Sequence, residues 1–371
     1  MNRPVSPVLI IGGGVFGLAI GWELARQGQS VTVLEQNQAG RGASWAAAGM
    51  LMPWKLSDAF SEPLFALQRH SHRLWPDFAA ELTRAGGMFL AYQMDGRYFL
   101  ATTEQSATRL RRQYEYHHGV GLPVEWLSGK QARRQLPALG GEVVAAVFSP
   151  AGHWVDNRQV ALALREAFMQ AGGNLREQSR AQGIVVEENR VCGVRLADGT
   201  VPPANTVVVA AGAWSSRLEG LPLLLRNTVQ PRKGQTLVLQ MDAAAPLVRH
   251  NLIGPVYMVP RPDGRLVVGT TVEREAGFNT QPTAGGVFQI LRKARQIVPA
   301  VDDLPLVEIS AGLRPTGPER LPLLGPTQVE GLLAAMGGHS YGILLAPVVG
   351  QSLAQVALTG RVPEIILPFL P

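Results

Sequence analysis

A glycine-rich turn near the start of the chain has the residue types and the spacing that bind a dinucleotide. Gly12, Gly14 and Gly17 stand in the order G-x-G-x-x-G, after the apolar segment 8–11 and at the start of a helix predicted over 15–27. The first glycine permits a tight turn, the second lets backbone amides approach a pyrophosphate, and the third lets helix and strand pack closely. A glycine turn without a ligand is the alternative, but the flanking strand and helix favour the dinucleotide site.

The residues around this turn are placed to contact the phosphates and the adenosine. At the predicted helix start, the free N–H groups near Val15 and Phe16 would donate to phosphate oxygens, helped by the helix dipole. The next strand, over 30–34, ends at Glu35, whose carboxylate would accept hydrogen bonds from the ribose hydroxyls, with Gln36 beside it. Strand, helix and strand in this order predict parallel strands joined by a right-handed crossover.

Two later runs of small residues favour FAD over NAD as the dinucleotide. Residues 40–50 follow the second strand, and residues 206–215 form a strand that ends in a further glycine turn. Small side chains let the backbone lie flat against a large planar ligand, and Ser44 offers a hydroxyl to a phosphate. Tight packing of helix on strand would explain either run alone, whereas both together favour a long, buried dinucleotide. The expected cofactor contacts in these runs are Ala43, Ser44, Ala48, Gly49, Met50 and Gly212.

Length and composition indicate a globular protein of two packed domains. The chain has 371 residues, of which 46% are hydrophobic and 17% charged. A single cysteine, Cys192, excludes a disulfide framework and fits a reducing compartment, so we expect a cytoplasmic location. The net charge of +6 comes from scattered arginines without a basic arm or zinc-finger spacing, so we expect neither nucleic-acid binding nor a metal site.

Two uncharged stretches, 4–22 and 331–360, are long enough to cross a membrane. Glycine clusters interrupt both stretches, which favours a buried strand, a turn and a helix in each case. Peripheral contact with a membrane stays open.

The order of apolar patterns predicts a mixed α/β fold in which two domains are interleaved. Helical periodicity occurs over 62–84, 159–171, 288–297 and 343–358, and strand patterns over 98–101, 143–148, 183–195, 235–272 and 332–336. We expect a Rossmann-type FAD-binding domain made of 1–90, 152–220 and 308–371. The remaining segments, 91–151 and 221–307, would form an antiparallel-sheet substrate domain.

Several motifs in fixed order resemble those of flavin-dependent D-amino-acid-oxidase-type enzymes. Besides the glycine turn, the motifs occupy 46–50, 210–215, 233–235, 311–315 and 338–347. The resemblance covers almost the whole chain, and it is greatest to the bacterial glycine oxidases associated with thiamine biosynthesis. It implies non-covalent FAD and a small amino-acid substrate.

The resemblance also implies roles for individual residues. Arg314 would pair with the substrate carboxylate, for which a planar guanidinium offers bidentate hydrogen bonds. Tyr257 would supply a second carboxylate contact, and Met50 an adaptable apolar wall near the flavin. The alternatives are a surface arginine before a turn proline and an ordinary strand aromatic. Further cofactor contacts are expected at Ala181 and, around the start of the last helix, at His339, Ser340, Tyr341, Gly342, Ile343 and Leu344.

One segment departs from the glycine-oxidase pattern. Those enzymes read Gly-His-aromatic-Arg-Asn-Gly, whereas residues 338–342 read Gly-His-Ser-Tyr-Gly, which is one residue shorter and lacks the arginine. The loss of a cation beside flavin and substrate leaves glycine specificity open. The positive end of the helix that follows would stabilise the anionic reduced flavin.

These observations predict the oxidative deamination of glycine or another small primary or secondary amino acid. Hydride would pass from the substrate Cα to flavin N5, and O2 would reoxidise the flavin to give H2O2. One alternative is a dehydrogenase of the same fold that passes electrons to a quinone, and another is a flavin-binding protein without turnover. We expect a homo-oligomer.

Overall fold

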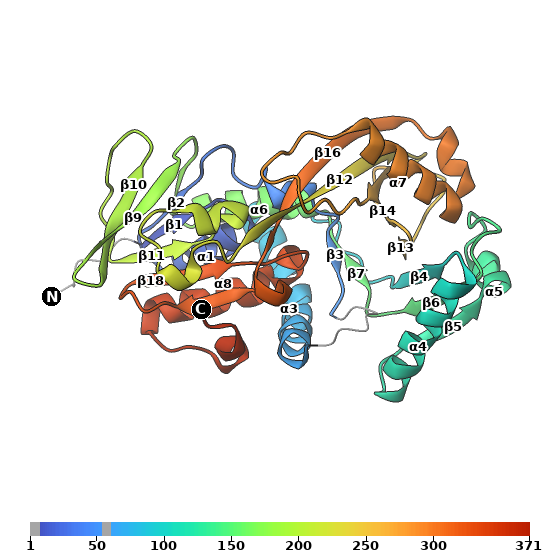
Figure 1. The fold of residues 1–371 in the computed structure, drawn as a ribbon, viewed down its shortest axis with the longest axis horizontal. Helices are drawn as coiled ribbons and strands as arrows, with labels where there is room; N and C mark the ends of the chain where they lie inside the picture. The colour runs from blue at the N-terminus through green and yellow to red at the C-terminus, as the bar shows by residue number, and fades with distance from the viewer. Residues whose placement is uncertain (1–7, 54–60) are drawn as a thin grey trace.

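The computed structural model describes residues 8–53 and 61–371, which form two large sheets lying at opposite ends of an elongated molecule (Figure 1). The beginning of the stretch 4–22, and a few residues of the expected first domain segment, lie outside the described residues. The C-terminus belongs to the end of the molecule that carries the glycine turn. A mixed α/β architecture was predicted and is confirmed.

The first sheet has six strands in the order β17-β18-β11-β1-β2-β8. β1 runs parallel to both β2 and β11, as the βαβ pattern predicts, and only β17 runs antiparallel to its neighbour. The strands are β17 Leu323–Pro326, β18 Leu332–Met336, β11 Thr206–Val209, β1 Val8–Ile11, β2 Val31–Leu34 and β8 Asn174–Arg176.

Both faces of this sheet are buried, which explains the uninterrupted apolar run of β1. Val8 and Ile10 face a core formed with α1 (Val15–Ala25), α3 (Glu62–Gly86), α6 (Asn157–Gln170) and α8 (Gly342–Thr359). Leu9 and Ile11 face a second core under the hairpin of β9 (Ala181–Glu187) and β10 (Arg190–Leu196). Every residue of α1 is buried because α6 and α8 pack on its two sides.

The second sheet has eight strands in the order β16-β12-β15-β14-β13-β4-β6-β5. All neighbours are antiparallel except β13 and β4. The strands are β16 Leu306–Thr316, β12 Gln230–Gln240, β15 Arg265–Gly269, β14 Tyr257–Pro260, β13 Asn251–Ile253, β4 Arg97–Ala101, β6 Ala145–Ser149 and β5 Glu125–Ser128. Helix α7 (Ala284–Ile297) packs its apolar stripe on one face of this sheet.

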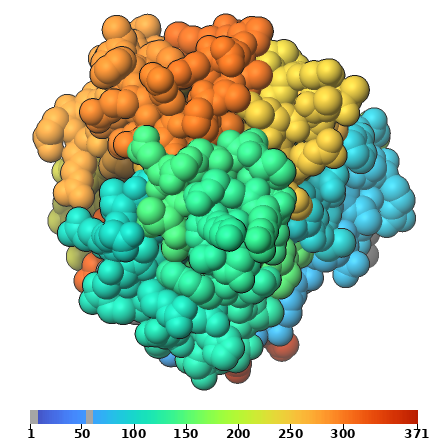
Figure 2. Space-filling view, turned by 90° about the vertical axis from the view of Figure 1, so that its right-hand side faces the viewer, coloured from blue at the N-terminus to red at the C-terminus, as the bar shows by residue number. Residues whose placement is uncertain are grey.

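Viewed from the end that carries the eight-stranded sheet, the molecule shows the α4–α5 region, coloured teal to green, below the α7 region, coloured orange (Figure 2). Helix α4 spans Glu104–Gly119 and α5 spans Gly129–Gln135. A third, two-stranded sheet joins the two ends in the middle: β3 (Met50–Leu51) pairs with β7 (His153–Trp154).

Three details differ from the sequence-based expectations. β16 belongs to the eight-stranded sheet, so residue 308, where we placed the return to the nucleotide domain, lies inside a strand of the other sheet; the domain ranges themselves stay a prediction. Helix α7 begins before Phe288, because the Thr283 hydroxyl caps it by accepting from the Gly286 amide. The strand expected to start at Val143 starts at Ala145.

Pro347 lies inside α8, beyond its first turn, and hydrogen bonds from α3 stabilise the turn that precedes it. A proline has no N–H and crowds the preceding turn. On that turn, the Leu344 carbonyl accepts hydrogen bonds from Ser71 Oγ at 2.6 Å and from Trp75 Nε1 at 2.9 Å, both on α3. These bonds fix the beginning of α8 against α3.

Helix α8 is the one helix of the described chain that is long and apolar enough to cross a membrane. In its 18-residue window, 67% of the residues are buried inside the protein, as in a core helix.

We expect Ser71→Ala to lower the stability of the protein by about 0.5–1.5 kcal/mol, because a buried donor to Leu344 is lost while Trp75 still donates. A fall of about 1–4 °C in the thermal midpoint, followed by flavin fluorescence and circular dichroism, would be the corresponding observation. Thr108→Ala is the control, since the Thr108 hydroxyl also donates to a helix carbonyl but is exposed. Equal midpoints for the two variants would remove the role assigned to Ser71.

Candidate active site

The glycine turn has the close contacts that its motif requires. Gly12 has a φ of +108°, and a Cβ built on it would lie 2.4 Å from the carbonyl oxygen of Ala210. A Cβ on Gly17 would lie 1.9 Å from the oxygen of Gly12. At Gly14, in contrast, a Cβ would meet only Ser44 Oγ, at 3.6 Å. The first and third glycines are therefore packed against backbone, whereas the second leaves room at the helix start where a phosphate would lie.

The residues expected at the phosphates lie together at the N-terminus of α1. Ser44, on the short helix α2 (Ala43–Ala46), is buried, and its Oγ accepts from the Val15 amide at 3.0 Å. Gly14 has no side chain to cap α1, so the first-turn N–H groups beyond that of Val15 can donate to an anion. This arrangement fits a pyrophosphate.

The adenosine end is arranged around Glu35. Its two carboxylate oxygens accept from the amides of Gly13, at 2.8 Å, and Asn37, at 2.9 Å. These bonds hold the side chain at the end of β2 and leave lone pairs for ribose hydroxyls. The amide of Ser179 donates to the Glu35 carbonyl at 2.8 Å, which brings Ala181 of β9 to this end of the site.

Glycines also bring the C-terminal motifs onto the nucleotide-binding segments. A Cβ on Gly338 would lie 2.9 Å from the ring of Phe16, and one on Gly312 would lie 2.5 Å from the Cβ of Ala46. The amide of His339 donates to the Pro315 carbonyl at 2.7 Å, and its Nδ1 lies 3.0 Å from Thr316 Oγ1. The end of β16 and the loop before α8 are thus joined beside α1 and α2.

Strand pairing places Arg314 and Tyr257 on one face of the eight-stranded sheet. Directly opposite residues in paired strands point to the same face. Thr236 lies opposite Gly269 and Ser310, and Gly269 lies opposite Tyr257. Arg314 is on the same side of β16 as Gly312 and Ser310, which face α2. The two residues expected to bind the substrate carboxylate therefore face the nucleotide-binding domain.

The guanidinium of Arg314 lies over Gly234, where a Cβ would come within 2.4 Å of both Nη atoms. Its Nη2 donates to Thr270 Oγ1 at 2.9 Å, and its buried Nη1 has no hydrogen-bond partner among the described residues. Burial lowers the pKa of Arg314, an effect that the nearby Tyr257 opposes. The Tyr257 hydroxyl lies 3.2 Å from Thr236 Oγ1. A buried cation with a free donor is suited to a carboxylate ligand.

Met50 lies beside these residues as an apolar wall. It pairs with Trp154 across β3 and β7. Met50 and Tyr257 both pack, half-buried, on one apolar cluster, which consists of Ala48, Ala91, Trp154, Val259 and Val267.

The start of α8 completes the site from the C-terminal side. Tyr341 is the N-cap residue and makes no side-chain cap bond, while Ile343 and Leu344 are buried. The amide of Tyr341 donates to the Gly338 carbonyl at 2.8 Å, and burial raises the pKa of the Tyr341 hydroxyl. The positive end of the helix dipole thus adjoins His339 and the end of β16.

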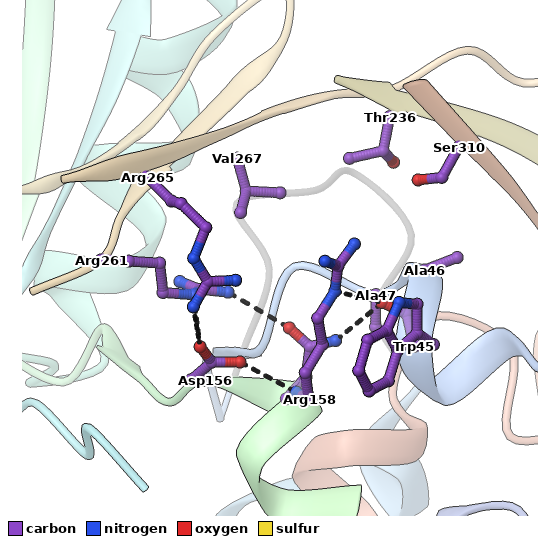
Figure 3. A pocket seen from close by; sticks show the side chains of 11 residues that line it. Trp45, Ala46, Ala47, Asp156, Arg158, Thr236, Arg261, Arg265, Val267 and Ser310 are labelled. Carbon is purple, nitrogen blue, oxygen red and sulfur yellow. Dashed lines mark hydrogen bonds and ion pairs between the residues drawn. The ribbon is translucent and has the colours of Figure 1, made fainter. Parts of the chain in front are cut away.

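A small recess, partly open to solvent, lies between the two domains along the same sheet face (Figure 3). The residues of α2 and of the start of α6 form one wall, and the large sheet forms the other. The lining residues are Trp45, Ala46, Ala47, Asp156, Asn157, Arg158, Thr236, Arg261, Arg265, Val267 and Ser310.

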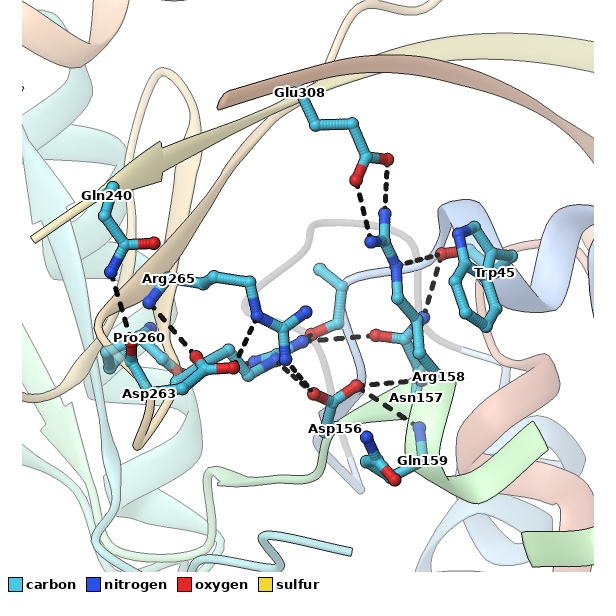
Figure 4. A network of polar contacts seen from close by, with 12 residues as sticks. Trp45, Asp156, Asn157, Arg158, Gln159, Gln240, Pro260, Asp263, Arg265 and Glu308 are labelled. Carbon is cyan, nitrogen blue, oxygen red and sulfur yellow. Dashed lines mark hydrogen bonds and ion pairs between the residues drawn. The ribbon is translucent and has the colours of Figure 1, made fainter. Parts of the chain in front are cut away.

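Ion pairs beside this recess connect the two domains (Figure 4). Arg158 of α6 binds both carboxylate oxygens of Glu308 on β16, at 2.8 and 2.5 Å. Arg265 Nη2 donates to Asp156 at 2.7 Å. Burial alone would raise the pKa of Asp156, but Arg261 and Arg265 outweigh it and lower that pKa.

Arg261 extends this network to the segment expected beside the flavin. Its Nη2 donates to the carbonyl of Ala48 at 2.9 Å and to Asn157 Oδ1 at 3.1 Å. Asp156 also caps α6, since its carboxylate accepts from the Arg158 amide at 2.9 Å.

A dinucleotide turn in one domain that faces a buried cation on the sheet of the other is the organisation of an FAD-dependent amino-acid oxidase. A family model described as DAO, FAD dependent oxidoreductase, matches residues 7–356, and the chain belongs to this family. The resemblance identified from the motifs is confirmed, and the cofactor of the family is FAD.

Individual relatives agree with this assignment. The chain is 34% identical over 366 residues to glycine oxidase from Geobacillus kaustophilus, which covers 98% of this chain and 95% of the relative. The crystal structure of glycine oxidase from that organism matches with a TM-score of 0.91 at 33% identity, over 98% of each chain. Iminodiacetate oxidase from Chelativorans sp. matches with a TM-score of 0.86 at 29% identity, over 98% of each chain.

The individual cofactor and substrate contacts stay predictions, although the structure brings most of these residues around one site. Sequence reasoning missed Gly234, Thr236 and Thr270, which surround Arg314 and Tyr257. The motif at 233–235 includes Gly234, but the importance of this glycine comes from its contact with Arg314. That residue lies some eighty positions later, so no local sequence pattern reveals the contact.

We expect Gly234→Ala to displace the Arg314 guanidinium, because the added methyl would overlap both of its Nη atoms. The KM for amino-acid substrates should rise at least about tenfold while FAD stays bound, since a charged hydrogen bond contributes about 1.5–3 kcal/mol. Steady-state kinetics and the flavin absorption spectrum measure the two effects. Gly285→Ala in α7 is the matched control, because no atom lies within 4 Å of the added Cβ. An unchanged KM in Gly234→Ala would contradict the prediction.

Proposed function

We propose that this enzyme oxidises glycine or another small primary or secondary amino acid, with O2 as the electron acceptor and H2O2 as a product. The observation that carries the proposal is the buried Arg314 Nη1, which lacks a partner among the described residues and faces the nucleotide-binding domain. A substrate carboxylate would supply its acceptor.

The chain's own residues would bind and orient the substrate. Arg314 would hold the carboxylate, and Tyr257 would donate a second hydrogen bond to it, which fixes Cα relative to the cofactor. Met50 would close one side of the site with apolar surface and so keep water away from the reacting carbon. FAD, when bound, supplies the acceptor for the hydride, which leaves the substrate Cα with its two electrons.

The names of the relatives support a small substrate. Glycine oxidases from Geobacillus kaustophilus and Pseudomonas aeruginosa are 34% and 33% identical to this chain. A bifunctional protein ThiO/ThiG from Trichormus variabilis is 32% identical, and this chain spans 52% of its length. We therefore place the reaction in thiamine biosynthesis as part of the proposal. The iminodiacetate oxidase match supports the inclusion of secondary amines.

The test is an anaerobic panel of glycine, sarcosine, iminodiacetate, D-alanine and L-proline added to the purified holoenzyme. Bleaching of the visible flavin band identifies each substrate, and peroxide formation in aerated buffer identifies oxygen as the acceptor. If no small amino acid bleaches the flavin, the proposal fails. Bleaching without peroxide formation would support amino-acid oxidation as the reaction but would favour a quinone over oxygen as the electron acceptor.

We expect Arg314→Met to lower kcat/KM for amino acids by about 10- to 200-fold, because a charged hydrogen bond to the carboxylate is lost. The change should be mostly in KM, with the flavin spectrum unaltered. Arg111→Met is the control, since Arg111 pairs with Glu115 on the exposed helix α4. Identical kinetics in the two variants would remove Arg314 from the carboxylate site.

A further inference from the structure

Three polar side chains stand in one row across the strands β13, β4 and β6 of the large sheet. Asn251 lies opposite Arg97, and Arg97 lies opposite Ser149. Side chains at such directly paired positions point to the same face of a sheet. The row is thus a local cluster, formed by residues that are far apart in the sequence (Figure 1).

All three side chains are buried, and their polar atoms lack partners. Arg97 is 4% exposed, and Asn251 and Ser149 are 0% exposed. No hydrogen bond is made by Arg97 Nε and Nη2, by Asn251 Nδ2 and Oδ1, or by Ser149 Oγ to any residue that the structure describes. Buried polar groups are nearly always hydrogen-bonded, so several unpaired atoms in one row indicate a missing ligand.

The charge of Arg97 is also uncompensated. No carboxylate of the described chain forms an ion pair with it, and its recorded contact is with the Phe99 ring, at 5.9 Å from the centroid. Burial lowers the pKa of Arg97 to about 9, which still leaves it protonated at neutral pH. The nearby His72 and His153 are neutral, since burial lowers their pKa values to about 4.

We propose that Arg97, Asn251 and Ser149 form a buried binding site for a small anionic group, of the size of a halide or a carboxylate. Water could satisfy the hydrogen bonds of the row, but it would leave the buried positive charge without a counter-charge. The turn after β6 packs on the backbone of Arg97, since a Cβ on Gly152 would lie 2.3 Å from the Cβ of Arg97. The near-complete burial of all three side chains favours a small ligand.

The position of the row separates it from the candidate substrate site. Asn251 is two residues from Ile253, the strand partner of Tyr257, so the row is displaced from Tyr257 by about 7 Å along the strands. It is also displaced across the sheet, because Arg97 on β4 is five strands from Arg314 on β16, about 24 Å at about 4.8 Å per strand. A small dicarboxylic amine held at Arg314 would not span this distance. The ligand is therefore a free anion, and the inference does not rest on the proposed function.

Thermal unfolding of the holoenzyme tests the site without reference to catalysis. We expect a midpoint about 1–3 °C higher in sodium chloride, bromide or acetate than in sodium gluconate of equal ionic strength, because gluconate is too large for the site. Arg97→Met should abolish this difference, whereas Arg111→Met should retain it. The comparison between variants removes the general effects of each salt. Equal midpoints in all four salts for the unaltered protein would overturn the proposal.

Bromide diffraction provides a second readout that does not depend on the folding of Arg97→Met. Crystals of the unaltered protein grown in bromide should give an anomalous peak within hydrogen-bonding distance of Arg97 and Asn251. Absence of the peak, together with equal midpoints, would assign the row to water alone.

Kinetics test the separation of the row from the substrate site. We expect chloride to change the KM values for iminodiacetate and glycine equally or not at all, while the thermal shift and the bromide peak are present. A severalfold rise in the KM for iminodiacetate alone would contradict a free-anion site and would assign the row to a substrate carboxylate. Failure of every amino acid to turn over would count against the proposed function and would leave the anion site supported.

Discussion

The two domains meet where a glycine leaves no side chain between them, since Gly312 of β16 lies against Ala46 of α2. Within the first domain, Gly338 lies against Phe16, and Gly12 and Gly17 allow a comparable approach of backbone. A single methyl at any of these positions would push apart elements that must converge on one flat ligand. The site therefore depends on close packing of backbone before it depends on any charge.

The arginines at the interface between the two domains have two different roles. Arg158, Arg261 and Arg265 bind Glu308, Asp156 and backbone carbonyls, and they fix one domain on the other. Arg314 retains a buried donor that these carboxylates do not reach. The three arginines between the domains are thus paired with carboxylates of the chain, whereas Arg314 is not. Pairing with a carboxylate separates these structural arginines from Arg314 more clearly than burial does.

Local patterns predicted much of the fold, because they act within one element or one turn. The apolar run of β1, the glycine turn and the strand β18 follow from neighbouring residues alone. Arg314 and Tyr257 were identified through a resemblance, since nothing near them in the sequence reveals what they face. The Thr283 cap was concealed by two glycines, and β16 was misplaced because strand partners depend on register. The row of Arg97, Asn251 and Ser149 arises from pairing between strands about fifty and about one hundred and fifty residues apart, which no single-segment pattern contains.

The attachment of α8 to α3 has a consequence for how this site can diverge. Ser71 and Trp75 hold the carbonyl of Leu344 just after the helix begins. Helix α3 therefore holds the beginning of α8 in place independently of the loop that precedes α8. Residues 338–342 can then change in length and charge, as they do here in comparison with the glycine-oxidase pattern, without displacing the helix end that faces the cofactor. Under the proposed function, substrate preference would depend on this loop and flavin redox tuning on the helix end, so mutation would alter the first without disturbing the second.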